Sequence, residues 1–287
     1  MEDENMISEM AGRGRNGISG MTLKIIALLL MFIDHAALIF FAGTIWYLPG
    51  RILGRISFPI FCFLIVEGYC HTRSVRRYAG RLFLFALISE IPFDYAFFGR
   101  LVYMGYQNVF FTLFLGLLAL ACYDVAAGWG IRGDEKWMEL SLNRKVIYSA
   151  AAKGMIILIL LAAWFFHTDY NAFGVVLILV LYIGRNRMNL KNQQMEEQGN
   201  TGQSENVRIY QRRWNYYVTT AFPAALVIIG YGLLKGFSME GFGALALILI
   251  GCYNGEKGNG RIPSLLFYAI YPLHLLLAGL LSVFLAA

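Results

Sequence analysis

The sequence predicts an all-α, polytopic membrane protein: one bundle of about nine transmembrane helices whose N-terminus faces the cytoplasm. Of the 287 residues, 58% are hydrophobic and only 15% are charged, and the mean hydropathy is +0.57. Soluble domains are usually about 45–50% apolar and about 25% charged. The apolar residues also gather in long runs, as transmembrane helices require. This composition excludes an intrinsically disordered chain, a fibrous protein and a typical soluble enzyme.

Nine apolar runs are long enough, or nearly long enough, to cross a bilayer, for which a helix needs roughly 20 apolar residues. The sixth and eighth runs are short, so we expect them to tilt or to lie inside the bundle. The predicted spans are 23–43, 52–70, 80–98, 108–127, 147–166, 171–184, 216–235, 241–253 and 264–284.

The basic residues predict the orientation, because Lys and Arg gather in the cytoplasmic loops of membrane proteins. With nine spans and a cytoplasmic N-terminus, 20 of the 24 Lys and Arg residues lie on the cytoplasmic side. One missed span would invert every assignment after it. The net charge of +6 therefore indicates membrane topology and contact with lipid, and we expect no nucleic-acid partner.

The chain is predicted to hold a single transmembrane domain over residues 22–287. Residues 1–21 are polar and are expected to form a flexible cytoplasmic tail, and residues 185–215 a flexible cytoplasmic loop. The four cysteines are scattered and form no CxxC motif, so neither a disulfide framework nor a metal site is expected. Walker A, GxSxG and HExxH motifs are absent from the sequence, which leaves ATP hydrolysis, esterase and zinc-protease chemistry without support.

Ionisable residues inside the spans carry the functional signal, because such residues are costly in lipid and usually face the bundle interior. The pair Asp34-His35 lies near the centre of the first span, and His274 near the centre of the ninth, just after Tyr271. A histidine exchanges protons near neutral pH, and a nearby carboxylate raises its basicity and fixes its tautomer. If the first and last spans are neighbours, His35 and His274 share one cavity. The structural alternative is a hydrogen-bonded pair that only fixes helix packing.

A second group lies at the predicted cytoplasmic end of the second span. Glu67 and His71 are four residues apart and share one helix face. Arg73, Arg76 and Arg77 follow directly and form a basic cluster with His71. Such a cluster suits the phosphates of a cytoplasmic cofactor. A basic loop that fixes the orientation of the protein in the membrane, or attraction to anionic lipid head groups, explains the cluster equally well.

The predicted outer ends carry further polar residues. Glu90 and Asp94 lie four residues apart in the third span, and Arg51 and Arg55 lie at the outer end of the second. We expect the arginines to pair with Asp94 or to hold an anionic substrate. The turn 167–170 is either a lip of the cavity or an ordinary polar loop.

Six sequence blocks, in this order, resemble the TraX family. They are LKIIALLLMFIDH (23–35), GRISFPIFCFLIVEGYCHTR (54–73), RLFLFALISEIPFD (81–94), NVFFTLFLGLL (108–118), DYNAFGVVLIL (169–179) and FYAIYPLHLLLAGL (267–280). The founding member of that family N-acetylates the pilin of a conjugative plasmid. The family is also distantly similar to membrane acyltransferases of the acyltransferase-3 and lysosomal heparan acetyltransferase type.

The resemblance implies an integral membrane acyltransferase of the bacterial inner (cytoplasmic) membrane. It would transfer an acyl group from cytoplasmic acyl-CoA, with acetyl-CoA as the expected donor, to an acceptor at or across the membrane. That acceptor is a peptide amine, a glycan hydroxyl or a lipid-linked sugar. His35, with Asp34 beside it, would be the catalytic base. The other residues fall into a group that would hold CoA (His71, Arg73, Arg76, Arg77) and a group that would line the substrate cavity (Glu67, Asp94, Arg55, His274, Tyr271).

Two other functions stay open. A proton-coupled transporter or flippase would use Asp34, His35, Glu67 and His274 as a proton relay, although the sequence lacks the internal repeat that many transporters show. A non-catalytic component of a conjugation or secretion assembly would need these residues only for stability.

Overall fold

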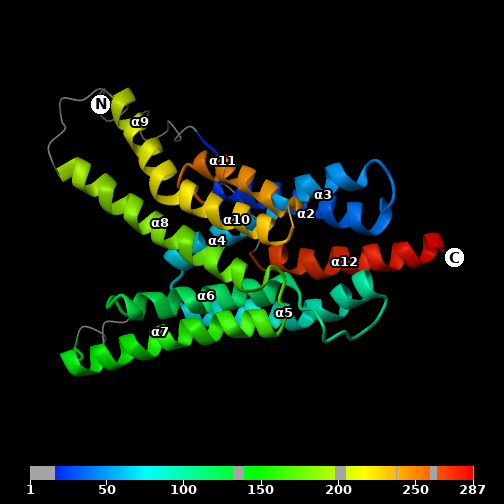
Figure 1. Cartoon of the computed structure of the whole chain (residues 1–287), viewed down its shortest axis with the longest axis horizontal. Helices are drawn as coiled ribbons and strands as arrows, with labels where there is room; N and C mark the ends of the chain where they lie inside the picture. Colours follow the sequence, from blue (N-terminus) through cyan, green and yellow to red (C-terminus); the bar gives the residue numbers. More distant parts are fainter. Residues whose placement is uncertain (1–16, 132–138, 198–204, 237, 259–263, 287) are drawn as a thin grey trace, which may run out of the picture.

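The computed structural model describes residues 17–131, 139–197, 205–236, 238–258 and 264–286. They form a bundle of helices (Figure 1), which confirms the all-α, polytopic architecture. The helices are α2 (Gly20–Phe40), α3 (Tyr47–Arg55), α4 (Ser57–His71), α5 (Val75–Phe98), α6 (Val109–Ala126), α7 (Leu142–Phe165), α8 (Asn171–Glu197), α9 (Glu205–Tyr216), the π-helix η2 (Tyr217–Ala221), α10 (Phe222–Leu234), the 3₁₀-helix η3 (Met239–Leu245), α11 (Ala246–Gly251) and α12 (Ser264–Ala286).

In the described part of the chain, seven helices are long and apolar enough to cross a membrane. The third predicted span is α5, which is not among these seven and carries five charged residues, Arg76, Arg77, Arg81, Glu90 and Asp94. The eighth is the short segment formed by η3 and α11. The count of nine and the side on which the N-terminus lies stay predictions. We call the end that carries Gly17 the inner end and the end that carries the α2–α3 loop the outer end, after the predicted orientation.

Local sequence explains where several helices begin and end. Before α2, the Ser19 hydroxyl accepts the backbone N–H of Thr22 at 3.2 Å, and before α6 the Asn108 side chain accepts that of Phe110 at 3.0 Å. Both are N-cap contacts that satisfy an otherwise free helix N–H. Helix α5 ends at Gly99, whose φ of +64° places it in the left-handed region that favours glycine.

Two predicted flexible segments contain more ordered structure than expected. Helix α8 continues to Glu197 and α9 begins at Glu205, so most of segment 185–215 is helical. Gly17–Ser19 pair with the chain after α11: the Ile18 N–H donates to the Cys252 carbonyl at 2.8 Å. The predicted tail at 1–16 and the loop residues 198–204 lie outside the described residues. Polar sequence alone did not distinguish a loop from the extension of an apolar helix.

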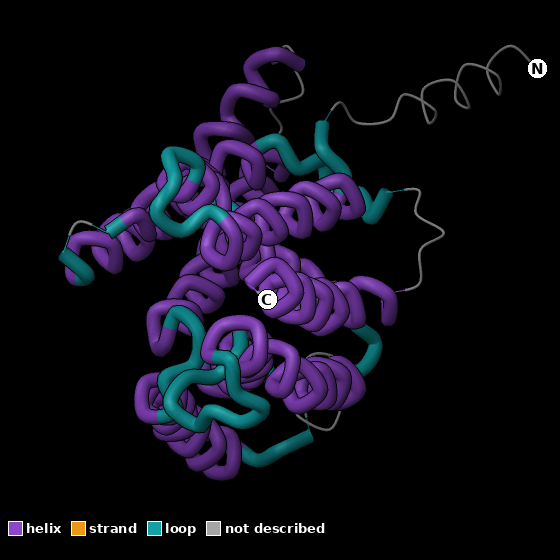
Figure 2. The backbone as a smooth tube through the Cα atoms, turned by 90° about the vertical axis from the view of Figure 1, so that its right-hand side faces the viewer, coloured by secondary structure: helices purple, strands orange, loops and turns teal. Residues whose placement is uncertain are grey.

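Helix α12 packs against both α5 and α2. The first and last spans are therefore neighbours, which meets the condition for His35 and His274 to lie close together. Helix α3 packs against α2 and η3. Figure 2 views the bundle from the right-hand end of Figure 1, so α12 is seen end-on with other helices around it. Polar residues from distant parts of the sequence are thus brought together at the outer end.

Candidate functional site

A cavity of about 700 Å³ opens among α2, α3, α4, α5, α12, η3 and the turn between α7 and α8. We call it the outer cavity. Phenylalanine and tyrosine side chains form much of its wall, and its charged residues are balanced, three acidic and three basic. The polar residues that line it include Asp34, His35, Arg51, Arg55, Tyr106, Asp169, Lys235 and Glu240. A cavity of this size, lined by aromatic side chains and by converging polar groups, is typical of a ligand site.

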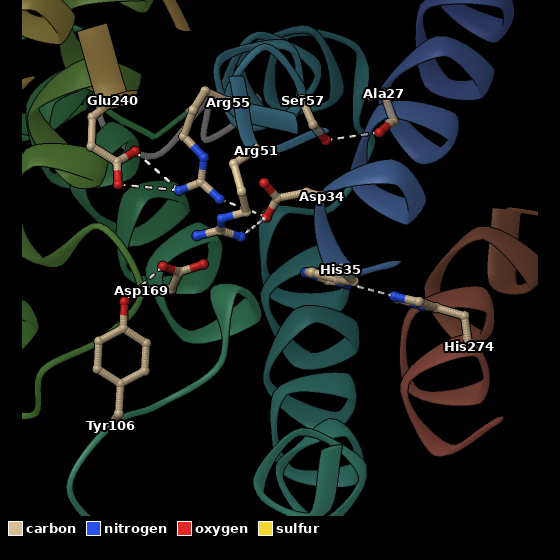
Figure 3. Close-up of polar contacts among 10 residues, drawn as sticks. All are labelled: Ala27, Asp34, His35, Arg51, Arg55, Ser57, Tyr106, Asp169, Glu240 and His274. Atoms are coloured by element: carbon tan, nitrogen blue, oxygen red, sulfur yellow. Dashed lines mark hydrogen bonds and ion pairs between the residues drawn. The ribbon is translucent and has the colours of Figure 1, made fainter. Parts of the chain in front are cut away.

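His35 lines the outer cavity and is paired with His274, which does not line it (Figure 3). His35 Nδ1 and His274 Nε2 are 2.7 Å apart, and His274 Nδ1 lies 3.0 Å from the Ile270 carbonyl oxygen one turn earlier in α12. Aromatic rings enclose the pair: Phe32 beside His274 and Phe97 beside His35, with centroid separations of 4.7 and 5.2 Å. The two histidines are therefore held among apolar rings.

Asp34 turns away from His35 and binds the two arginines of α3. Asp34 Oδ2 accepts hydrogen bonds from Arg51 Nη1 at 2.7 Å and from Arg55 Nη2 at 2.5 Å. Gly54 permits this approach, because a Cβ there would collide with the Asp34 side chain. Adjacent residues on a helix point about 100° apart, so the Asp34 carboxylate does not hydrogen-bond to the His35 ring. The expectation that Asp34 fixes the tautomer of His35 is therefore wrong, and so is the pairing of these arginines with Asp94.

Arg55 is the centre of an ion-pair network that joins α2, α3 and η3. Its Nη1 lies 3.1 Å from both carboxylate oxygens of Glu240, while its Nη2 binds Asp34. The guanidinium also lies over the Tyr170 ring, 5.8 Å from its centroid. The Nε atoms of Arg51 and Arg55 are buried without a hydrogen-bond partner among the described residues.

Asp169 contributes a carboxylate from the turn between α7 and α8. The Tyr106 hydroxyl donates to its Oδ1 at 2.8 Å, and the Thr112 hydroxyl donates to its backbone carbonyl. Tyr170 and Asn171, which follow it, have φ values of +61° and +47°, which are uncommon for residues other than glycine. Burial raises the pKa of Asp169 to about 6, and the hydrogen bond from Tyr106 opposes this shift.

We expect Asp169→Asn to change how stability depends on pH. The pKa in an unfolded chain is about 3.9, so between that value and about 6 the folded protein retains a proton that the unfolded chain has lost. The stabilisation linked to this proton is present below pH 4 and is lost as pH rises through 6. The melting temperature of the variant, relative to wild type, should therefore be higher at pH 7 than at pH 4.5. Thermal unfolding in detergent measures this, with the exposed Glu256→Gln as control; parallel curves would contradict it.

A second cavity, of about 490 Å³, lies on the inner side of the first. We call it the inner cavity. The two cavities share four lining residues: Met31, Phe61, Val109 and Tyr271. Tyr271 is buried, with 4% of its surface exposed, and therefore stands between them. The basic side chains that line the inner cavity are Lys24, His71, Arg81 and Lys257.

Glu67 also lines the inner cavity, and both of its carboxylate oxygens accept a hydrogen bond. Its Oε1 accepts from Arg185 Nε at 2.6 Å, and its Oε2 accepts from the Tyr253 hydroxyl at 3.2 Å. His71 lies one turn away, with Nδ1 3.7 Å from Glu67 Oε2. Glu67 thus joins α4 to α8 and to the segment after α11.

Five of the predicted site residues line neither cavity: Arg73, Arg76, Arg77, Asp94 and His274. Arg73, Arg76 and Arg77 are exposed on the inner end and line neither cavity. Asp94 is buried, and its Oδ2 accepts the backbone N–H of Tyr103 at 2.6 Å, so it anchors the loop after α5. The basic lining that the sequence placed on the arginine cluster comes instead from cationic residues on other segments.

Sequence reasoning missed several lining residues. Lys24, Arg81 and Lys257 were counted only among the basic residues that predict the orientation, because each lies at the end of an apolar run. Glu240 was not predicted, although an acidic residue directly before the apolar segment 241–253 is a signal related to the one given by Asp94 inside the third span. Only the folded chain shows which terminal charges point inward.

Comparison with known proteins gives two matches. The family model described as "TraX protein" matches residues 19–195, more than half of the chain. A probable fimbrial assembly protein, FimC of serogroup H1 from Dichelobacter nodosus, is 40% identical over 110 residues. That match covers 36% of this chain and 45% of the fimbrial protein, so it spans less than half the length of that relative. No solved structure matches the chain.

Proposed function

The chain belongs to the TraX family, and we propose that it is a membrane acyltransferase that takes an acyl group, acetyl in the first instance, from cytoplasmic acyl-CoA. The acceptor would be an amine or a hydroxyl bound in the outer cavity, and the membrane would be a bacterial inner membrane. The observation that carries the proposal is the arrangement of two cavities end to end, with basic side chains lining the inner one and His35 lining the outer one.

The proposed reaction uses His35 as a general base. The acceptor nitrogen or oxygen attacks the carbonyl carbon of the thioester, a new C–N or C–O bond forms, and the C–S bond breaks. His35 Nε2 takes the proton of the acceptor and passes it to the departing CoA sulfur, which leaves as the thiol. The guanidinium groups of Arg51 and Arg55 line the outer cavity and would supply positive charge near the negative charge that develops on the carbonyl oxygen.

The inner cavity supplies the binding site for the donor. Lys24 lies half-buried in α2 and Arg81 half-buried in α5, while Lys257 lies after α11, so basic groups converge from three segments. Phosphate groups of CoA are recognised by such charge-assisted hydrogen bonds. The pantetheine arm is narrow and would reach past Tyr271 to bring the thioester to His35.

Removal of the inner cavity's charges is expected to weaken donor binding. Lys24→Gln and Arg81→Gln should each raise the apparent KM for acetyl-CoA about 10-fold, because each removes one charge-assisted hydrogen bond worth roughly 1.5 kcal/mol. The rate at saturating donor should change little. The exposed Arg73→Gln and Arg76→Gln are matched controls. If the exposed arginines shift KM and the cavity residues do not, the donor site is wrong.

Incubation of the purified protein with radiolabelled acetyl-CoA and a membrane extract tests the function itself. We expect label to appear in a protein, glycan or lipid fraction, and the labelled fraction identifies the acceptor class. No transfer to any fraction, together with no saturable binding of acetyl-CoA, would reject an acyltransferase.

A non-catalytic assembly role is the second candidate, favoured by the name of the fimbrial assembly protein that the chain resembles. It predicts that substitutions in the outer cavity matter only where they lower stability. A transporter would instead move a solute without consuming acyl-CoA. Transfer assays and thermal unfolding on the same variants therefore separate the three.

A further inference from the structure

We infer that His274 is a positioning residue: through its hydrogen bond to Nδ1 of His35, it holds His35 in the tautomer that leaves Nε2 as the proton acceptor. This inference rests on the proposed function for its consequence in catalysis. The hydrogen-bond geometry that supports it does not depend on that function.

The chain of contacts begins at a backbone carbonyl. His274 Nδ1 lies 3.0 Å from the Ile270 carbonyl oxygen. A carbonyl oxygen only accepts hydrogen bonds, so Nδ1 of His274 must carry the proton. In a neutral imidazole the other nitrogen is then an acceptor. Nε2 of His274 is therefore unprotonated, and its lone pair points at His35.

The tautomer of His35 follows from this. Its Nδ1 lies 2.7 Å from Nε2 of His274, so Nδ1 of His35 must donate the proton. The angle between the two ring planes is only 2°. The distance between the ring centroids is 5.0 Å, which exceeds the N–N distance by about two ring radii. The rings therefore meet edge to edge in one plane, with each nitrogen pointing along the other's lone-pair direction (Figure 3).

The remaining nitrogen of His35, Nε2, is thus unprotonated, and His35 lines the outer cavity. The neighbours of the pair are apolar: Phe32, Phe97 and the ring of Tyr271 pack against it. Among the described residues, no carboxylate is hydrogen-bonded to either ring. A histidine and a backbone carbonyl here occupy the place that a carboxylate takes in serine-hydrolase triads, where it holds the base in the correct tautomer.

The pair also gives the proton a path during transfer. When His35 Nε2 accepts the acceptor's proton, the proton on its Nδ1 can shift to His274 Nε2. His274 then carries the positive charge, with both of its N–H groups hydrogen-bonded, and His35 is neutral with its proton on Nε2. The reverse shift returns the proton to the CoA sulfur, so both rings end as they began.

Two substitutions at position 274 separate positioning from packing. His274→Gln keeps an oxygen that can accept the N–H of His35, whereas His274→Leu fills similar space without an acceptor. We expect the Leu variant to lower kcat for acetyl transfer about 100-fold with little change in KM, and the Gln variant to retain most of the activity. Equal activity of the Leu variant and wild type, or equal loss in both variants at unchanged melting temperature, would overturn the inference.

A second measurement needs no activity. The chain has only four histidines, so ¹⁵N-histidine labelling gives few signals, each assignable by a single substitution. In detergent-solubilised wild type we expect His35 and His274 both to carry the proton on Nδ1, and His35 to lose that preference in His274→Leu. An Nε2–H tautomer for His35 in wild type would overturn the inference. If wild type transfers no acyl group, the proposed function fails, and the labelling experiment still decides the hydrogen-bond chain.

Discussion

Replacing His35 by asparagine is expected to lower acyl transfer by about 100-fold or more while the protein remains folded. General-base catalysis contributes typically 10²- to 10⁴-fold to a rate, and asparagine cannot accept a proton at neutral pH. The proposed donor site is the inner cavity, which His35 does not line, so the KM for acetyl-CoA should stay within about 2-fold of wild type. Steady-state kinetics with purified protein measure both constants.

His167→Asn is the matched control, because it removes an imidazole from an exposed outer turn that lines neither cavity. It should leave kcat and KM unchanged. Both variants should unfold within a few degrees of wild type, since His35 is only partly buried and makes one side-chain hydrogen bond. Full activity of the His35 variant would reject His35 as the base, whatever the control does.

Hydropathy and charge predicted most of the fold because a bilayer imposes simple requirements. Apolar runs of sufficient length became helices, with ends close to those expected: the run 108–127 became α6, Val109–Ala126. The helical structure of the charged run 185–197 was harder to predict, because a polar extension of a helix has no hydropathy signal. Residues such as Asn171 and Tyr170, whose φ is positive, give no warning in the sequence either.

The candidate site was predictable in its parts but not in its connections. His35 and His274 lie at similar depths in the first and last spans, so the sequence predicted that they meet if those spans are neighbours. Helix α12 does pack against α2. Sequence adjacency was misleading for Asp34, because neighbours on a helix diverge, and the partners of Asp34 come from α3 instead. Long-range pairing such as Arg55 with Glu240, 185 residues apart, depends on tertiary packing that one sequence does not reveal.

The Arg55 network should be the most sensitive point for stability. Arg55→Met leaves the Glu240 carboxylate without its ion-pair partner, while Asp34 keeps Arg51. The side chains of Arg55, Asp34 and Glu240 are only 11%, 9% and 16% exposed. Breaking a buried ion pair from one side costs roughly 3–5 kcal/mol, because a charge remains buried and unpaired. The apparent melting temperature in detergent should therefore fall by on the order of 10 °C.

A double variant distinguishes a lost charge partner from lost packing. Arg55→Met combined with Glu240→Gln removes the unpaired charge and should recover part of the stability lost in the single variant. Arg100→Met, at an exposed position of the outer end, is the control and should melt close to wild type. If the double variant is less stable than Arg55→Met alone, the guanidinium acts through its packing on Tyr170. If Arg55→Met melts like the control, the network does not hold η3 to α2 and α3, and the outer cavity must owe its shape to its aromatic wall.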